Sequence, residues 1–183
     1  GHASMLERRS ALATAKPCTS AALEIRESPD FTLIQIASLS ADFERRLKSV
    51  VGPLTRSVGT AKAQEGRTLL RVGPSQFWIV GAADDDIAAA LSGLGAATPL
   101  SHSRTRIALA GVPAREVLAK LVPLDFHPKT FGAGSFAMTG LHHTPVLIHC
   151  TGKASFDVYA LRTFAMSVWD AIADAALEHS DRS

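Results

Sequence analysis

The chain has 183 residues, of which 20% are charged and 6% aromatic, and its formal net charge is +2. This length is compatible with one domain or two small halves. The small net positive charge and the few aromatic rings argue against a nucleic-acid-binding surface. No apolar run reaches the roughly 18 to 20 residues of a transmembrane helix, and no signal-peptide segment begins the sequence. The chain has two cysteines and no CxxC motif, so we expect a cytoplasmic protein with free thiols. We also expect no membrane partner.

The composition is more apolar than that of an average soluble domain, with 46% hydrophobic residues and a mean hydropathy of +0.14. Two explanations stay open. A partner chain covers part of the surface, in which case the isolated chain would self-associate to hide that surface. Alternatively, an alanine-rich chain simply has a well-filled core.

The first regular elements follow an irregular stretch that is rich in Ala, Ser and Thr. Alternation of apolar and polar residues predicts strands at Leu23–Ser28 and Phe31–Ser38, joined by a Pro-Asp turn. Ser40 is the predicted N-cap of a helix, in which Glu44 and Lys48 would form an i,i+4 pair. The apolar face of this helix consists of Phe43, Leu47, Val50 and Val51.

A hairpin and a second helix complete the first half. Thr68–Gly73 and Gln76–Gly81 flank a Pro-Ser pair and are typical of a β-hairpin. The acids Asp84, Asp85 and Asp86 come next and could suggest a metal site. Acids at a helix N-terminus satisfy free amides and interact favourably with the helix dipole, so we interpret them as a helix start.

The second half repeats this plan. Arg104–Gly111 is a predicted strand, and Pro113 suits the first position of the next helix. A hairpin is predicted around His142–His143, followed by a strand at Ser155–Leu161 and a last helix from about Arg162. Hairpins interleaved with helices predict an α+β protein with two similar ferredoxin-like halves, each an antiparallel or mixed sheet with helices on one face. The predicted organisation is a cloning remnant at 1–4, an N-terminal arm at 5–22, and α+β halves at 23–97 and 98–179.

The common motifs of catalysis and nucleotide binding are absent from the sequence, which has no GxGxxG, GxxxxGK[ST], GxSxG or HExxH. Gly132-Ala133-Gly134 lacks a third glycine and opens no helix. His142 and His143 are neighbours and would point to opposite faces of a strand, as would His149 and Cys150, so neither pair predicts a zinc site. The prediction is a chain with no catalytic, cofactor-binding or metal-binding residue of its own.

One segment could have either a catalytic or a structural role. Within VPLDFHPKTFGAG, Leu124 and Phe126 would point one way in an extended chain, and Asp125 and His127 the other way. The latter two could be a general base and the acid that orients it. The two prolines that flank LDFH restrict the backbone to extended geometry, however, and these polar groups can satisfy local amides. We interpret Leu124, Asp125, Phe126 and His127 as a structural connector.

Several segments resemble the gamma subunit family of heterotetrameric sarcosine oxidases. They are MLERRSALA, LLRVGPSQFWIV at Leu69–Val80, the whole of Ser101–Met138, and FDVYALRTFAMSVWDAIADAA. The most specific feature is an AREVLAK helix followed by PLD, an apolar residue and HP. Ser103 departs from the glycine expected at its position.

The resemblance implies a non-catalytic subunit with the aminomethyltransferase folate-binding fold. The implied complex oxidises the N-methyl group of sarcosine and passes the one-carbon unit to tetrahydrofolate. Its partners would be alpha, beta and delta subunits, with FAD, FMN, NAD and tetrahydrofolate bound by the large subunits and zinc by delta. A stand-alone folate-dependent aminomethyltransferase is the alternative, although the chain is short for that role. A hydrolase using His127 and Asp125 would lack an identifiable nucleophile.

Overall fold

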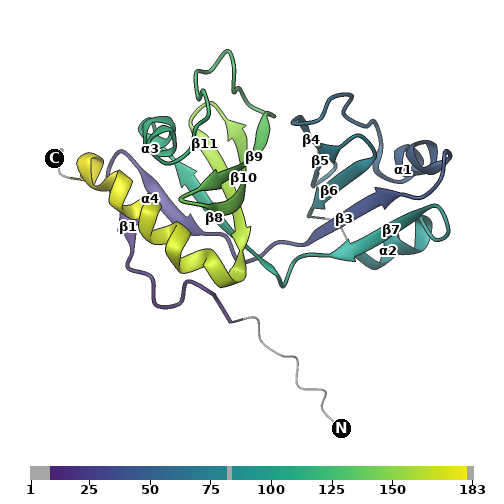
Figure 1. Cartoon of the computed structure of the whole chain (residues 1–183), viewed down its shortest axis with the longest axis horizontal. Coiled ribbons are helices and arrows are strands. Elements are labelled where there is room, and N and C mark those ends of the chain that lie inside the picture. The colour runs from purple at the N-terminus through teal and green to yellow at the C-terminus, as the bar shows by residue number, and fades with distance from the viewer. Residues whose placement is uncertain (1–8, 82–83, 181–183) are drawn as a thin grey trace, which may run out of the picture.

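The computed structural model describes residues 9–81 and 84–180, which form two antiparallel sheets with helices on their outer faces (Figure 1). The six-stranded sheet has the order β1-β2-β8-β11-β10-β9 and the five-stranded sheet the order β4-β5-β6-β3-β7. The first comprises β1 (Cys18–Thr19), β2 (Glu24–Glu27), β8 (Arg104–Ala110), β9 (Phe136–Leu141), β10 (Thr144–Gly152) and β11 (Ser155–Leu161). The second comprises β3 (Leu33–Ser38), β4 (Ala61–Gln64), β5 (Arg67–Gly73), β6 (Gln76–Val80) and β7 (Gly95–Pro99). The predicted α+β class is confirmed.

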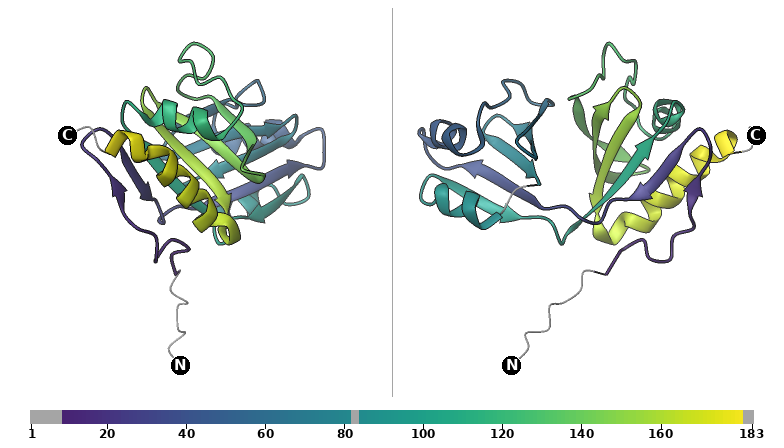
Figure 2. Two further views of the ribbon diagram at one scale, coloured as in Figure 1. Left: turned by 60° about the vertical axis from the view of Figure 1, so that its left-hand side comes forward. Right: turned by 180° about the vertical axis from the view of Figure 1, so that it is seen from behind.

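Amphipathic helices cover the outer face of each sheet (Figure 2). On the five-stranded sheet, α1 (Phe43–Val51) and α2 (Asp84–Ala90) bury apolar side chains against β3, β5 and β6. On the six-stranded sheet, α3 (Ala114–Leu121) and α4 (Ala165–Ser180) do the same, with the 3-10 turn η1 (Arg162–Phe164) preceding α4. The predicted apolar face of α1 is largely right, since Phe43, Leu47 and Val51 are buried.

The inner faces of the two sheets meet in a third apolar cluster. Tyr159 of β11 lies edge-on to Trp78 of β6, with ring centroids 6.1 Å apart, and to Phe31, at 6.0 Å. The backbones also touch, because the Ala61 amide donates to the Gly134 carbonyl at 2.7 Å. The two halves are therefore packed together through their inner faces and through this backbone contact.

The strands are not divided between the sheets as the chain ranges predicted. Strand β2, placed by sequence in the half at 23–97 as the neighbour of β3, pairs instead with β8 of the other sheet. Ile25 of β2 belongs to the same apolar cluster as Ile107 and Leu109, and burial there outweighs the short connection to β3. Three strands were not predicted: β1, which lies within the predicted arm, β4, and β7, which extends the first half to Pro99.

Two local predictions for α1 are wrong. The helix begins at Phe43 with Asp42 at the N-cap position, and the Ser40 hydroxyl has no hydrogen-bond partner among the described residues. Glu44 pairs with Arg71 of β5, at 2.7 Å, because tertiary packing brings that guanidinium to the helix. The α2 helix starts at Asp84 as predicted, and the side chains of Asp84 and Asp85 lie outside the described part.

Candidate functional site

The segment interpreted as a connector lies between α3 and β9. Phe126 is only 5% exposed, and its ring is edge-on to Phe131 and Phe156 with centroids 5.3 and 5.9 Å away. Leu124 is half-buried against the same core. The apolar side chains of this segment therefore hold it onto the six-stranded sheet.

Arg115 of α3 bridges both ends of this segment. Its Nη1 donates to the carbonyl oxygens of Phe126 at 2.7 Å and Phe131 at 2.8 Å. Its Nε and Nη2 donate to the Lys153 carbonyl, both at 3.2 Å, and the guanidinium lies over the Phe156 ring. Nothing in the sequence predicted this role for Arg115, because its acceptors are backbone carbonyls from distant positions.

Asp125 and His127 make local hydrogen bonds and are both exposed. The Asp125 carboxylate accepts from the His127 amide at 2.9 Å, and His127 Nδ1 accepts from the Lys129 amide at 3.3 Å. The backbone amide of His127, and then the Thr130 side chain, lower the pKa of Asp125. This arrangement stabilises a turn, and it does not use the carboxylate to orient the imidazole. That these residues have no catalytic role stays a prediction.

The inner face of the six-stranded sheet carries a buried polar cluster that sequence analysis missed. His149 of β10 lies directly opposite Asp157 of β11, and Tyr159 and Arg106 lie beside them. Burial lowers the pKa of His149 to about 4, so this imidazole is neutral at pH 7. Burial raises the pKa of Asp157 against the opposing effects of Arg106 and Arg26. Only the strand register, which sequence does not provide, brings these groups together.

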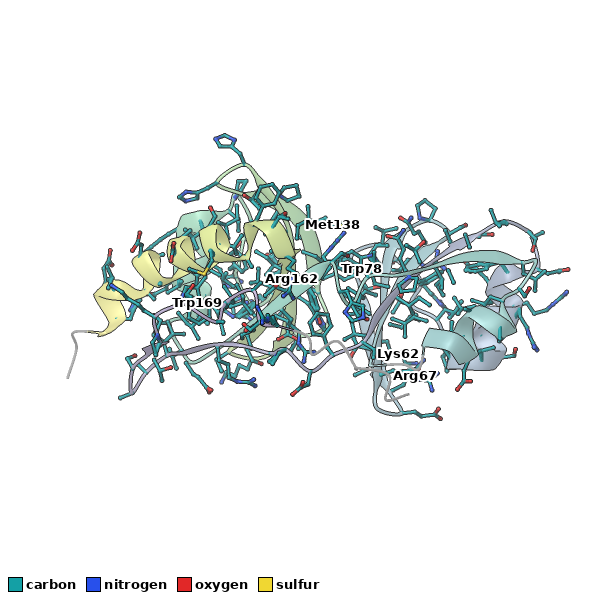
Figure 3. All side chains as sticks on the ribbon, turned by 90° about the horizontal axis from the view of Figure 1, so that it is seen from below. Lys62, Arg67, Trp78, Met138, Arg162 and Trp169 are labelled. Atoms are coloured by element: carbon teal, nitrogen blue, oxygen red, sulfur yellow. The ribbon has the colours of Figure 1, made fainter. Side chains whose placement is uncertain are left out.

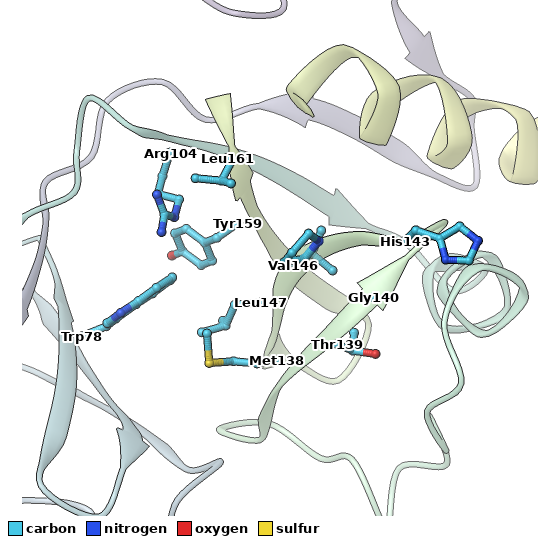
Figure 4. Close-up of a pocket in the computed structure, with 11 residues that line it drawn as sticks. Trp78, Arg104, Met138, Thr139, Gly140, His143, Val146, Leu147, Tyr159 and Leu161 are labelled. Atoms are coloured by element: carbon cyan, nitrogen blue, oxygen red, sulfur yellow. The ribbon is translucent and has the colours of Figure 1, made fainter. Parts of the chain in front are cut away.

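A pocket of about 420 Å³ opens where the two halves meet (Figure 4). Trp78, Tyr159 and Arg104 gather at one end, and the Arg104 guanidinium lies 5.8 Å from the Trp78 ring centroid. Met138 and Trp78 lie on either side of the junction between the halves (Figure 3). Desolvation lowers the pKa of Arg104. Among the described residues, the walls are mainly apolar, and His143 and Thr139 are polar residues that line the pocket beside Arg104. The pocket can hold an apolar group.

The histidines that sequence analysis considered are spread over separate places. His142 and His143 form the tight turn between β9 and β10, with φ values of 46° and 69°, so they lie outside a regular strand. His149 points to the inner face of its sheet, whereas Cys150 packs in the outer core. Over residues 9–81 and 84–180, no group of three or more potential ligands could hold a metal ion. Ser101, which precedes His102 in the sequence, accepts a hydrogen bond from the Leu33 amide at 2.8 Å, and this bond ties β3 to the turn before β8.

The two-sheet architecture recurs in a solved structure of low sequence identity. Aminomethyltransferase T of the glycine cleavage system from Bartonella henselae superimposes with a TM-score of 0.64 at 16% identity, over 84% of this chain and 46% of that one. At this identity the likeness concerns the fold alone. In the described part, no helix is long and apolar enough to cross a membrane.

Closer relatives define the family. The model of the sarcosine oxidase gamma subunit family matches residues 93–178. The sarcosine oxidase gamma subunit of an Arthrobacter species is 32% identical over 154 residues, which cover 80% of this chain and 76% of that subunit. That of Corynebacterium sp. strain P-1 is 29% identical over 91% of this chain and 86% of the relative. The chain belongs to the sarcosine oxidase gamma subunit family.

A solved structure agrees with this family. A chain of the heterotetrameric sarcosine oxidase from Corynebacterium sp. U-96, in complex with pyrrole 2-carboxylate, superimposes with a TM-score of 0.85 at 27% identity. The match covers 96% of this chain and 98% of that one. The resemblance read from the sequence is therefore confirmed.

Proposed function

We propose that this chain is the non-catalytic gamma subunit of a heterotetrameric, cytoplasmic sarcosine oxidase-like complex. The observation that carries the proposal is the match, over 96% of the chain, to a chain of a heterotetrameric sarcosine oxidase. Its partners are alpha, beta and delta subunits, and the chain contributes to their assembly. The complex oxidises the N-methyl group of sarcosine, yields glycine and hydrogen peroxide, and passes the one-carbon unit to tetrahydrofolate.

The side chains of this chain support an assembly role. Asp125 and His127 bond to local backbone, and the pocket at the junction combines apolar walls with a single arginine. A pocket of this kind can bind and position a neighbouring chain. Flavin or folate chemistry needs other residues, which the partner subunits would supply. FAD, FMN, NAD and tetrahydrofolate are accordingly assigned to the partners.

Co-expression with the alpha, beta and delta subunits of the same organism's complex tests the proposal. The tagged chain should capture all three partners, and the captured complex should consume sarcosine and release peroxide. The isolated chain should be colourless, without a flavin absorption band, and should not oxidise sarcosine. A purified chain that carries flavin, or that fails to capture any large subunit, would contradict the assigned role.

A stand-alone aminomethyltransferase is the second candidate, favoured by the fold shared with aminomethyltransferase T. The chain matches only 46% of that protein, so a folate site there would have to form within about half the usual structure. Calorimetry with tetrahydrofolate and the isolated chain separates the candidates. Saturable binding of tetrahydrofolate would favour the enzyme, and no binding favours the subunit.

A further inference from the structure

The edges of the two sheets differ in how they are protected from pairing with another chain. Sheet edges are commonly blunted by shortness, by lysine or by proline, because exposed backbone groups invite a further strand. At three edges the chain follows this rule: β1 has two residues, β4 has four and includes Lys62, and β7 ends at Pro99. The fourth edge, β9, has six residues, FAMTGL, with neither charge nor proline. This edge has the features of a strand that is covered in the working protein.

The hydrogen-bonding groups of β9 point outward at alternate residues. The Phe136 amide donates to the Gly59 carbonyl at 2.9 Å, on the side away from β10. Because strand residues alternate in direction, the backbone groups of Met138 and Gly140 point to that same side. No backbone hydrogen bond to the amide of either residue occurs within the described ranges, and both residues are exposed. Beyond Phe136, β9 therefore presents unpaired donors and acceptors at strand spacing.

The pocket at the junction lies directly beside this edge. Met138 of β9 is 61% exposed and lines the pocket together with Leu147 and Trp78. Beside Gly140 there is open space, since a Cβ built there would meet nothing within 4 Å. The described residues that line the pocket are mainly apolar. An occupant that complements these walls has apolar side chains.

We infer that an extended segment of a partner subunit adds to β9 as a further strand of the six-stranded sheet. Its backbone pairs with Met138 and Gly140, and its apolar side chains on the inner face enter the pocket. Backbone pairing gives affinity in such strand addition, and the pocket gives specificity. This inference rests on the proposed role as a subunit, and it names the surface through which that role operates.

Hydrogen exchange tests the pairing directly. The amides of Met138 and Gly140 should exchange freely in the isolated chain and at least about tenfold more slowly in the assembled complex, because bonded amides exchange only on opening. The Ala63 amide is the matched control. It belongs to the β4 edge, in a strand position with the same outward parity as Ala61, whose amide bonds Gly134. Exchange that stays unchanged at both β9 amides in an intact complex would overturn the inference.

A proline substitution removes one outward donor without touching the ladder to β10. Gly140→Pro should leave the melting temperature of the isolated chain nearly unchanged, since proline is tolerated where a strand's amide faces solvent. It should weaken capture of the large subunits on the order of tenfold or more, because a buried carbonyl of the partner loses its donor. Ala63→Pro makes the same change on the β4 edge and should assemble like the wild type.

Four further outcomes bear on the inference. Wild-type levels of assembly by a folded Gly140→Pro would refute strand addition at β9. Should that variant misfold, the exchange of the wild-type amides decides the question. Sedimentation that detects a dimer of the isolated chain, lost in Gly140→Pro while assembly persists, would assign the edge to a second copy and overturn the inference. If the wild type captures no large subunit, the proposed function itself fails. If the complex assembles but the β9 amides are not protected from exchange, only the strand addition fails.

Discussion

Truncation of Phe126 to alanine measures how strongly the connector is held by its apolar side chains. The ring is 5% exposed and edge-on to both Phe131 and Phe156, so the substitution leaves a cavity between two rigid rings. Losses of about 3 to 5 kcal/mol are usual for a buried phenylalanine. The two edge-on contacts each contribute roughly 0.5 to 1.5 kcal/mol beyond burial, so the expected loss of stability lies toward the upper end of this range.

Thermal unfolding of the isolated chain, followed by calorimetry and circular dichroism, is the assay. At about 2 to 4 °C per kcal/mol for a chain of this size, Phe126→Ala should lower the melting temperature by roughly 6 to 20 °C. His127→Ala is the matched control, because the neighbouring side chain is exposed and should change stability by no more than about 0.5 kcal/mol. A folded Phe126→Ala variant that loses less than about 1 kcal/mol would refute the connector interpretation.

The remaining predictions concern His127, Arg115 and His149. His127→Ala should leave sarcosine turnover per assembled complex almost unchanged, and a loss of about a hundredfold with assembly intact would instead indicate general acid–base catalysis. Arg115→Met should lower the free energy of unfolding by roughly 2 kcal/mol and speed amide exchange over 123–134, because three backbone carbonyls lose their donors; Arg115→Lys should not restore the wild-type value. Since burial lowers the pKa of His149 from 6.5 to about 4, the unfolded chain binds the extra proton between these values. Stability should therefore fall as the pH drops from about 6.5 to 4, by up to about 3 kcal/mol. Urea titrations should find a shallower fall in His149→Gln, and equal slopes in the two proteins would contradict the burial of a neutral imidazole.

Local patterns were sufficient for most elements of this fold. Apolar alternation interrupted by Pro-Ser correctly predicted the hairpin of β5 and β6, because such pairs restrict the backbone to a turn. The helix faces followed from 3.6-residue spacing, since an amphipathic helix must bury one side wherever it packs. Strands β4 and β7 were missed for a related reason. The AKAQ and GAATP segments of β4 and β7 carry little apolar alternation, and they are strands because neighbours supply their hydrogen bonds.

Strand partners and side-chain neighbourhoods were not open to the same reasoning. Alternation marked β2 as a strand, but its place beside β8 depends on where Ile25 finds an apolar core. Arg115 reaches carbonyls 11 and 16 residues away, and no local pattern records such acceptors. The opposition of His149 and Asp157 likewise depends on strand register, and a shift by one residue would place them on opposite faces.

Family membership, α+β class and the absence of a recognised catalytic motif follow from the order of residues, because motifs and periodicity are properties of short segments. The pocket beside Trp78 and the open edge of β9 follow from the packing of two sheets whose strands are distant in the chain. Which strand lies at an edge depends on how the other strands pair, and a pocket depends on which surfaces pack beside each other. Neither is a property of any one segment, and both depend on long-range contacts that local preferences leave undetermined.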